Sequence, residues 1–408
     1  MDWGGCGGPE VVGHLYNEAT RGAAVMAFEY TRSWLQQGRT WALDPDLSLV
    51  PGRTYPPNRR NDFGLFLDSA PDRWGRMLLQ RRENWLARQE GRKPKALREW
   101  DFLMGVEDVT RLGALRFRRS EKDPWLATDS DLPVPPVSHV RELAATAARV
   151  EADAGAASDE EEGRWLRQLC APGSSMGGAR PKAVVRDERG DLCLAKFPGR
   201  QDRVDVAAWE HVANLIARRA GIDAPETRLL QWGQAGSTLL IKRFDRTAQG
   251  GRIPYASAMT LLGRRDGESG ASYLELAELL MQQGARAQSD AAELFRRALF
   301  NVAVSNTDDH LRNHGFLLTE RGWALAPAFD VNPNPDGGPH ALALDELADE
   351  GDLETVMDAR KSYGVHEKDA QAALKAVTTA VGEWRAVAER VGIARREMEA
   401  YASAFKVG

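Results

Sequence analysis

The alternation of apolar and polar positions predicts that the chain begins with strands and ends with helices. Short runs near its start alternate at every second position, and a run with helical spacing follows. The elements predicted there are three strands and a helix: Val11–Tyr16, Ala24–Tyr30, Leu112–Phe117 and Asp72–Gln89. Pro133, Pro135 and Pro136 then indicate a linker. The acidic stretch Glu151–Gly163 is predicted to be a helix end with an exposed loop.

A hairpin and a capped helix are predicted in the middle of the chain. Strands Lys182–Arg186 and Leu192–Phe197 flank a turn at Glu188–Gly190. Asp205 can cap a helix that continues to about Ala220, because its side chain accepts from the free N–H groups of the first turn. Two further strands are predicted after this helix, Thr227–Gln231 and Thr238–Arg243.

After residue 255 the pattern is mostly helical. The exception is a strand pair, Gly315–Thr319 and Trp323–Ala326, and the stretch Lys368–Phe405 predicts two or three helices. A strand-rich lobe therefore precedes a helical lobe, so the predicted fold class is α+β with two lobes. Nucleotides commonly bind in a cleft between such lobes, and the polar loop Asn306–Asn313 is expected to face it.

Composition narrows the class of protein. A chain of 408 residues with 43% apolar and 28% charged residues is an ordinary globular protein of two or three subdomains. The net charge of -5 argues against binding nucleic acid through the overall field. The basic stretch Arg73–Arg98 is interpreted as the solvated face of an amphipathic helix, with a nucleic-acid surface as the alternative. We expect no membrane span, no secretory signal in Met1–Glu10 and a cytoplasmic location.

The loop Asn306–Asn313 and the later Asp330 suit phosphoryl transfer. Four residues separate Asp308 from Asn313, the spacing of the base and the metal-binding Asn in protein-kinase catalytic loops. Asp330 follows a strand, as the principal magnesium ligand of a kinase does, and carboxylate and amide oxygens suit Mg²⁺. The alternative is that Asp308, Asp309 and Asp330 only cap turns. Their order along the chain favours a kinase that depends on ATP and Mg²⁺.

The Gly-rich turn Gly173–Lys182 adds a candidate phosphate site. It matches neither a Walker A sequence nor the protein-kinase glycine loop, but its glycines allow N–H groups to surround a phosphate. Lys182 is predicted to tether the phosphates. Lys196, alone among apolar neighbours on a strand, is a second candidate, with an edge-strand gatekeeper as the alternative. Glu210 is predicted either to pair with a phosphate-binding Lys or to occupy an exposed helix position.

Two histidines, His310 and His314, lie in and just after this loop. Two histidines without a third spaced ligand do not make a metal site. We expect a structural histidine that holds the loop by hydrogen bonds.

Together these motifs resemble the HipA family of bacterial serine/threonine kinase toxins. The order is Ser-x-Gly-Gly-Ala-x-x-Lys, Lys-Phe-Pro, Arg-Phe-Asp-Arg, Asn-x-Asp-x-His-x-x-Asn and Phe-Asp. The matching segments are Ser175–Lys182, Lys196–Pro198, Arg243–Arg246, Asn306–Asn313 and Phe329–Asp330. Phe63–Phe66 and Asp68–Arg76 are similar to that family's first subdomain. The resemblance covers nearly the whole chain.

The resemblance implies a role for each motif. The fold would be a two-lobed kinase core, related to phosphatidylinositol and protein kinases, with an N-terminal β-rich subdomain. Its expected parts are residues 1–125 as this subdomain, 140–254 as the β-rich nucleotide-binding lobe and 255–408 as the helical catalytic lobe. Asp308 would be the catalytic base, and Asn313 and Asp330 would bind magnesium. The implied ATP-binding residues are these two together with Gly177, Gly178, Ala179, Arg180, Pro181, Lys182, Lys196, Lys242, Arg243, Phe244 and His310.

The resemblance also implies regulation and partners. Ser175, or its neighbour Ser174, would be autophosphorylated and switch the kinase off. Family members act with a small helix-turn-helix antitoxin (HipB-like), and the pair binds operator DNA, so this chain would reach DNA only through its partner. The best-known members phosphorylate an aminoacyl-tRNA synthetase.

Three positions depart from the family pattern, although none of them removes a catalytic group. Arg312 replaces a Lys, Arg180 replaces a common Gln, and Lys242 replaces a frequent Glu beside the hinge. Two alternatives stay open. One is a kinase of the same fold without an antitoxin, acting on another protein or a metabolite. The other is a non-catalytic transcriptional co-repressor.

Overall fold

The chain folds into two compact units, each described here by itself. The computed structural model describes residues 1–3, 8–20, 23–57, 60–128, 134–152, 158–170, 178–232, 236–345 and 352–406. The first unit contains Met1–Gln201 and Trp232–Ala256, and the second contains Asp202–Gln231 and Ser257–Gly408. The three predicted parts, residues 1–125, 140–254 and 255–408, stay a prediction.

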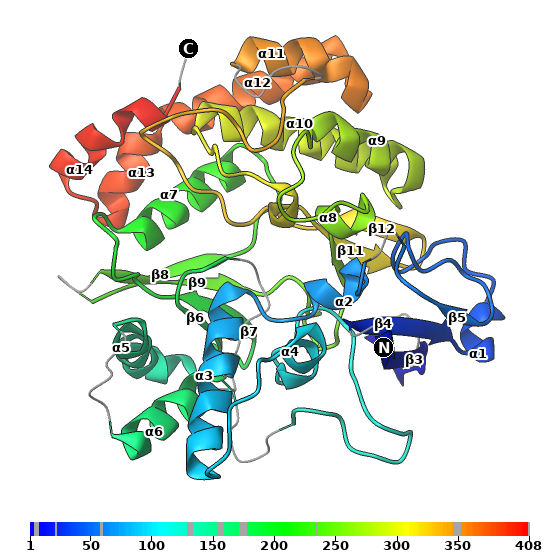
Figure 1. Ribbon diagram of the computed structural model, residues 1–408. Coiled ribbons are helices and arrows are strands. Elements are labelled where there is room, and N and C mark those ends of the chain that lie inside the picture. The colour runs from blue at the N-terminus through cyan, green and yellow to red at the C-terminus, as the bar shows by residue number, and fades with distance from the viewer. Residues whose placement is uncertain are drawn as a thin grey trace. The chain divides into compact units, whose positions relative to one another are not determined.

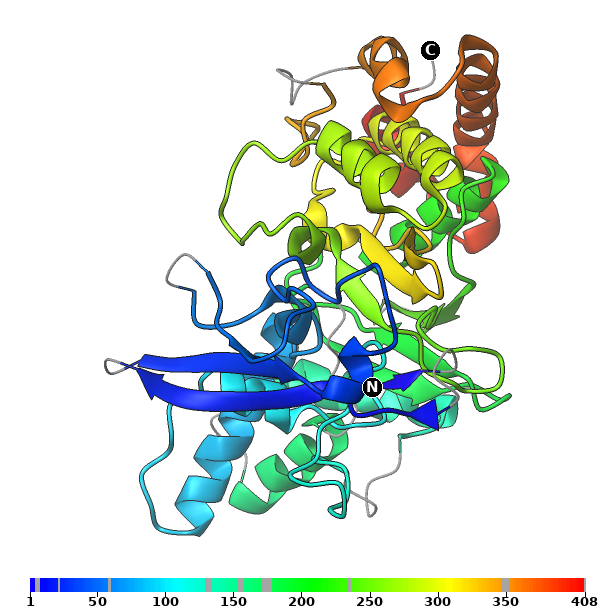
Figure 2. The same cartoon turned by 90° about the vertical axis from the view of Figure 1, so that its right-hand side faces the viewer.

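A strand-rich region opens the first unit. Strands β3 (Gly13–Thr20), β4 (Ala23–Tyr30) and β5 (Arg53–Thr54) form an antiparallel sheet in that order. Figure 2 shows β3 and β4 as one long hairpin. The short strands β1 (Asp2–Trp3) and β2 (Gly8–Pro9) pair beside it. Phe28 on β4 packs against Phe66, so apolar side chains join this sheet to the next helices.

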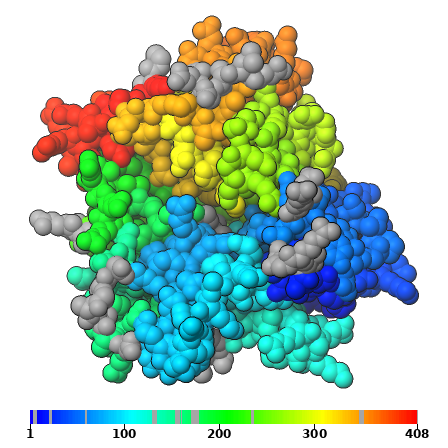
Figure 3. All heavy atoms as spheres, viewed as in Figure 1, coloured from blue at the N-terminus to red at the C-terminus, as the bar shows by residue number. Residues whose placement is uncertain are grey.

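Six described helices belong to the first unit. They are α1 (Arg32–Leu35), α2 (Gly64–Asp68), α3 (Arg73–Gln89), α4 (Glu99–Gly105), α5 (Val140–Glu151) and α6 (Asp159–Cys170), with a 3-10 turn at Val137–His139. The predicted helix near Asp72–Gln89 is confirmed as α3, and Asp72 is its N-cap. The helix buries Trp74 and Leu78 and exposes Arg73 and Arg82, which confirms the amphipathic interpretation of this basic stretch. In Figure 3 the outer face of α3 is light blue at the lower centre.

Two predictions for the first unit are wrong. Leu112–Phe117 is not a strand, because only isolated backbone hydrogen bonds, such as Asp2 N to Ala114 O, reach it and side chains fix the rest of its conformation. Gly113 has a left-handed φ of 75° and its N–H donates to Asp245 Oδ2 at 2.7 Å, while Arg116 pairs with Asp108 at 2.6 Å. In the acidic stretch Glu151–Gly163 the exposed loop was predicted too long, since α6 already begins at Asp159.

A second sheet in the first unit carries the predicted hairpin. Strands β6 (Lys182–Arg186), β7 (Leu192–Lys196) and β9 (Ser237–Lys242) are antiparallel, and β7 lies between the other two. The residues of β6 and β7 are almost all buried. Because β7 is a central strand, the interpretation of Lys196 as an edge-strand gatekeeper is wrong.

Helices dominate the second unit. They are α7 (Val206–Arg219), α8 (Ala258–Leu261), α9 (Tyr273–Gln283), α10 (Ala287–Ala303), α11 (Leu353–Asp358), α12 (Glu367–Gly382), α13 (Trp384–Val391) and α14 (Arg395–Ala400), with 3-10 turns at Leu311–Asn313, Ala359–Tyr363 and Ala402–Ala404. Strand β8 (Thr227–Gln231) follows α7, and β11 (Gly315–Thr319) pairs with β12 (Gly322–Leu325). The short strand β10 (Tyr255–Ser257) crosses the division between the units.

The core of the second unit surrounds α10. Figure 1 shows α10 beside α9, and α10 also contacts α11 and α12. An aromatic cluster joins α7 and α13 to the segment after α14. In it Trp209 of α7 stacks on Tyr401 with ring centroids 4.1 Å apart, and Trp384 of α13 stacks on Phe405 at 4.3 Å. Lys406 N donates to Ala303 O at 2.7 Å, so residues 401–406 pack against the end of α10.

None of the helices in the described part of the chain combines the length and the apolar character that a membrane span requires.

Candidate active site

Helix α10 delivers the predicted catalytic loop. Its last turn ends at Ala303, and Ser305 then takes a left-handed φ of 49° that redirects the chain. Asn306 is fastened back to the helix, because its N–H donates to Asn301 O at 2.8 Å and its Nδ2 donates to Asn301 Oδ1 at 3.1 Å. A non-glycine residue in this backbone region is strained, and such strain persists only where the surroundings fix it.

The loop brings the predicted base and the predicted metal ligand into one turn. Asp308 is exposed, whereas Asn313 is buried. Asn313 N donates to His310 O at 2.8 Å, and Asn313 Nδ2 donates to Asp308 O at 3.1 Å. The amide nitrogen Nδ2 can only donate, so the amide oxygen Oδ1 of Asn313 is the side-chain atom suited to a cation.

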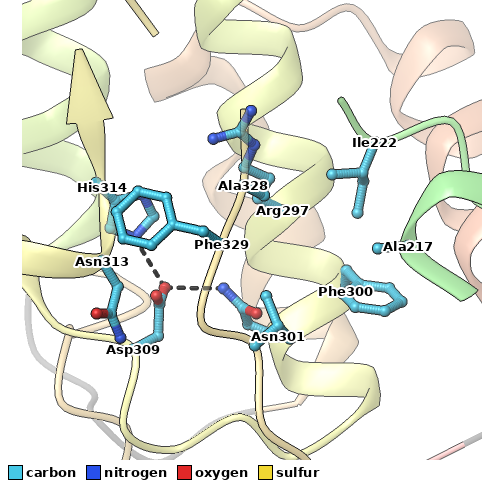
Figure 4. A pocket seen from close by; sticks show the side chains of 11 residues that line it. Ala217, Ile222, Arg297, Phe300, Asn301, Asp309, Asn313, His314, Ala328 and Phe329 are labelled. Carbon is cyan, nitrogen blue, oxygen red and sulfur yellow. Dashed lines mark hydrogen bonds and ion pairs between the residues drawn. The ribbon is translucent and has the colours of Figure 1, made fainter. Parts of the chain in front are cut away.

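A buried network around Asp309 supports this turn. The carboxylate accepts from Tyr273 Oη of α9, from Asn301 Nδ2 of α10 at 2.8 Å, and it pairs with His314 Nε2 at 2.8 Å. Figure 4 shows Asp309 between Asn301 and His314, in a pocket that Arg297 and Phe329 also line. Burial alone would raise the pKa of Asp309, but the imidazole of His314 and the hydrogen bonds from His314 and Tyr273 lower it.

His314 therefore confirms the prediction of a structural histidine that holds the loop by hydrogen bonds. The Nδ1 atoms of both His310 and His314 are buried without a hydrogen-bond partner in the described part of the chain. Sequence reasoning missed Tyr273, which precedes the loop by more than a helix, and Asn301, which lies in the last turn of α10. The available signal was a polar Asn301 among apolar neighbours at the end of a helix, eight residues before Asp309.

Asp330 is joined to the same loop by hydrogen bonds. It has a left-handed φ of 60°, and Asn332 Nδ2 lies 3.4 Å from its Oδ1. Asn332 N donates to Asn306 Oδ1 at 3.2 Å, and Asn334 Nδ2 donates to Thr307 Oγ1 at 2.8 Å. Hydrogen bonds therefore join the segment that follows Asp330 to the loop that contains Asp308 and Asn313, and the role of these three residues as one site stays a prediction.

The oxygen atoms of this assembly fit magnesium. Asn332 Oδ1 is buried without a hydrogen-bond partner in the described residues, beside the carboxylate of Asp330. No group of three or more His, Cys, Asp or Glu side chains arranged for a metal occurs in the described residues. Mg²⁺ usually keeps several waters and needs only one or two carboxylates, so a set of Asp and Asn oxygens suits it better than a full cage.

The first unit holds both predicted phosphate lysines. Lys182 and Lys196 are buried, and Lys182 Nζ forms an ion pair with Asp72 Oδ2 at 2.8 Å. Of the predicted phosphate loop, Gly178 to Pro181 are described, and Gly178 has a φ of 100° that favours glycine. Ser174, Ser175 and Gly177 lie outside the described residues.

The predicted hinge residues have side chains engaged within the first unit. Lys242 pairs with Asp191 at 2.5 Å, and Phe244 lies 6.3 Å from Tyr255, centroid to centroid. Arg243 is buried and pairs with Asp245 at 2.6 Å while donating to Thr110 O. The side chain of Arg243 thus holds the end of β9 to a distant segment, and the role of Lys242, Arg243 and Phe244 as the hinge stays a prediction.

Two further positions were weighed from the sequence. Glu210 of α7 is buried, so the alternative of an exposed helix position is wrong. It belongs to the second unit and Lys196 to the first, and their pairing stays a prediction. Arg312, which departs from the family pattern, binds both carboxylate oxygens of Asp266 at 2.8 and 2.6 Å.

Comparisons with known proteins agree on one family. Residues 174–385 match the family model described as the HipA-like C-terminal domain. A Haemophilus influenzae protein named "Putative kinase" is 28% identical over 224 residues, which are 48% of this chain and 65% of that protein. Toxin YjjJ of Escherichia coli K12 is 30% identical over 170 residues, 40% of this chain and 38% of the toxin. The match thus spans less than two thirds of either relative.

A solved structure shows the fold. The chain resembles HipA in the complex of Shewanella oneidensis MR-1 HipA, HipB and operator DNA, with a TM-score of 0.65 and 17% identity. The likeness covers 96% of this chain and 92% of the other. It confirms the predicted α+β, two-lobed kinase-like fold with a β-rich N-terminal region and a helical C-terminal lobe.

Proposed function

Since the chain belongs to the family of the HipA-like C-terminal domain, we propose that it is a protein kinase that transfers the γ-phosphoryl group of ATP to a serine or threonine hydroxyl. The observation that carries the proposal is the hydrogen-bonded assembly of Asp308, Asn313 and Asp330 in the second unit. The carboxylate of Asp308 is exposed. Asn313 in the same loop and Asp330 in a segment hydrogen-bonded to it carry side-chain oxygens that can bind a metal ion. Phosphoryl transfer needs positioning and charge stabilisation more than covalent chemistry.

The residues divide the work as follows. Asp308 accepts the proton of the acceptor hydroxyl as that oxygen bonds to phosphorus and ADP leaves. Asn313 and Asp330 hold the magnesium ion, and Lys196 contacts the phosphates. Magnesium, when bound, supplies neutralisation of the charge that develops on the phosphate oxygens. Asp309 stays buried and holds Asp308 and Asn313 in their turn.

Regulation and partners extend the proposal. The Shewanella structure contains HipB and operator DNA with HipA, which supports a small DNA-binding antitoxin as the partner of this chain. The resemblance of the Gly-rich segment further supports autophosphorylation at Ser175 or Ser174. An aminoacyl-tRNA synthetase is the protein substrate that the resemblance favours.

Substitution of the two aspartates tests the kinase. Asp308→Asn and Asp330→Asn should each leave a folded protein whose transfer of labelled phosphate falls by a factor of about 10² to 10⁴. Asp336→Asn is the matched control, because Asp336 is exposed in the segment that follows Asp330. Intact-mass analysis after incubation with Mg-ATP should also show one added phosphate on the Ser174/Ser175 peptide in the wild type only. Undiminished labelling in either aspartate variant would overturn the assignment.

A further inference from the structure

The two phosphate-site lysines are neighbours across one strand pair. Lys182 of β6 and Lys196 of β7 are register partners, and Phe197 N donates to Pro181 O at 2.9 Å directly beside them. That bond marks the pair as the closely spaced, non-hydrogen-bonded type, in which facing Cα atoms are about 4.5 Å apart. The two side chains therefore point to the same face, with exposed fractions of 1% and 7%. Two buried ammonium groups so close repel each other unless a carboxylate compensates.

Asp72 supplies a carboxylate from outside the sheet. Its Oδ2 lies 2.8 Å from Lys182 Nζ, and both side chains are almost fully buried. Its Oδ1 accepts from Gly75 N at 2.8 Å as the N-cap of α3. Two residues later, Trp74 Nε1 donates to Lys182 O at 3.0 Å. The first turn of α3 thus holds Lys182 by its ammonium group and by its carbonyl.

Lys182 also contacts Gly178, which precedes β6. A Cβ atom placed on Gly178 would lie 3.3 Å from Lys182 Nζ, so the ammonium group is packed directly under this residue. A bulkier residue at position 178 would also be strained by the φ of 100°. The position of the Lys182 ammonium group therefore restricts the position of the Gly178 backbone.

We propose that Asp72 is a positioning residue of the nucleotide site. It holds Lys182 as an anchor beside Gly178 and so fixes the backbone of Gly178–Pro181 for a nucleotide phosphate, while the neighbouring Lys196 is the lysine that contacts the phosphates. This inference rests on the proposed kinase function. It makes the first turn of α3, which lies more than one hundred residues before Gly178, a part of phosphate recognition. It also changes the predicted role of Lys182 from phosphate tether to anchor.

The direction in which the Mg-ATP affinity changes distinguishes Lys182 as an anchor from Lys182 as a phosphate ligand. Asn caps a helix as well as Asp does, so Asp72→Asn keeps the cap of α3 and removes only the charge. With the anchor weakened, the full chain should bind Mg-ATP about 10-fold less tightly in isothermal titration. Asp352→Asn makes the same change at the N-cap of α11 and should keep the wild-type affinity. If Lys182 were itself the phosphate ligand, Asp72→Asn would release it, and unchanged or tighter binding would overturn the inference.

A double variant separates positioning from folding. Asp72→Asn leaves Lys182 buried without its carboxylate, whereas Asp72→Asn with Lys182→Met removes both charges and restores the stability of the fold. We expect the double variant to unfold near the wild-type temperature but to bind Mg-ATP as weakly as Asp72→Asn does. Wild-type affinity in the double variant would contradict a positioning role. Failure of the wild type itself to bind Mg-ATP would instead contradict the proposed kinase function.

Discussion

At the scale of single residues, Asp308 and Asp309 are chemically identical neighbours in opposite environments. Asp308 is exposed, while Asp309 is buried among Tyr273, Asn301 and His314. Spacing in the sequence identified Asp308 as the candidate base. It could not show that Asp309 is buried, because its partners come from α9, α10 and the start of β11. Burial of the second carboxylate explains how the first is held without being neutralised.

Removing the hydroxyl of Tyr273 tests this support. Tyr273→Phe deletes one donor to a buried carboxylate, so the free energy of unfolding should fall by about 1–3 kcal/mol. Because Asp309 adjoins Asp308, kcat should fall while KM for ATP changes less. Tyr363→Phe is the matched control, since the buried hydroxyl of Tyr363 has no hydrogen-bond partner in the described residues. If Tyr273→Phe and Tyr363→Phe showed the same free energy of unfolding in urea and the same initial rate, the network around Asp309 would not have the proposed role.

Single residues also show which features no local sequence pattern predicts. Lys182 was singled out correctly as a residue of interest, but its partner Asp72 is more than one hundred residues away and no local pattern connects them. The left-handed backbone of Asp330 and Ser305 was equally hidden, because the sequence signal for such a conformation is glycine.

At the scale of elements, local patterns predicted helices and hairpins well. Helix α7 begins after the expected cap Asp205, helix α3 begins where a helix was predicted, and the pair β6–β7 matches the predicted hairpin almost residue for residue. These features depend on side chains a few positions apart. Leu112–Phe117 was predicted wrongly because its conformation depends on Asp245, which lies far along the chain.

A buried carboxyl group that accepts a hydrogen bond from the first turn of α2 has an ionisation that opposes folding. Asp44 accepts from Asp46 N and from Leu65 N, both at 2.8 Å, and burial raises its pKa to about 6 against the partial compensation of these bonds. In the unfolded chain this pKa is 3.8. The folded state therefore holds the proton more tightly, and the stabilisation present below about pH 4 is lost as pH rises through 6.

Asp44→Asn should remove this pH dependence. Two pKa units correspond to about 3 kcal/mol, so the wild type should lose up to about that free energy of unfolding between pH 4 and pH 7 at this site. The variant should show a flatter profile in urea unfolding at pH 4.5, 5.5 and 6.5. A profile with the wild-type slope would show that Asp44 does not titrate in this range.

At the scale of the whole molecule, the first unit is held together by contacts between distant segments. Arg243 donates to the carbonyls of Thr110 and Arg111, and Asp245 accepts from Gly113 N. Arg243 and Arg246 pair with the same Asp245, all three in the interior. Burial would raise the pKa of Asp245, but the two guanidinium groups outweigh it and lower the value to about 2. The carboxylate therefore stays charged well into acid.

Loss of this carboxylate should destabilise the first unit. Asp245→Asn leaves two buried guanidinium groups without their shared partner, which typically costs about 3–5 kcal/mol. Hydrogen exchange should rise first in the peptides around residues 107–116 and 243–252, while α9 and α10 of the second unit stay protected. Uniform loss of protection across both units would contradict the local role. In the wild type, hydrogen exchange in these peptides should rise only as pH falls from about 4 toward 2, where Asp245 takes up a proton.

The contact of Lys406 with Ala303 has a consequence for how the protein is made. A ribosome completes α10 and the loop Asn306–Asn313 long before it adds residues 401–406, whose aromatic rings stack on Trp209 of α7 and Trp384 of α13 and whose backbone contacts the end of α10. A nascent chain that stops before Tyr401 lacks these contacts. We therefore expect such unfinished translation products to contain the loop Asn306–Asn313 and yet to hold the end of α10 less firmly than the longer chain does.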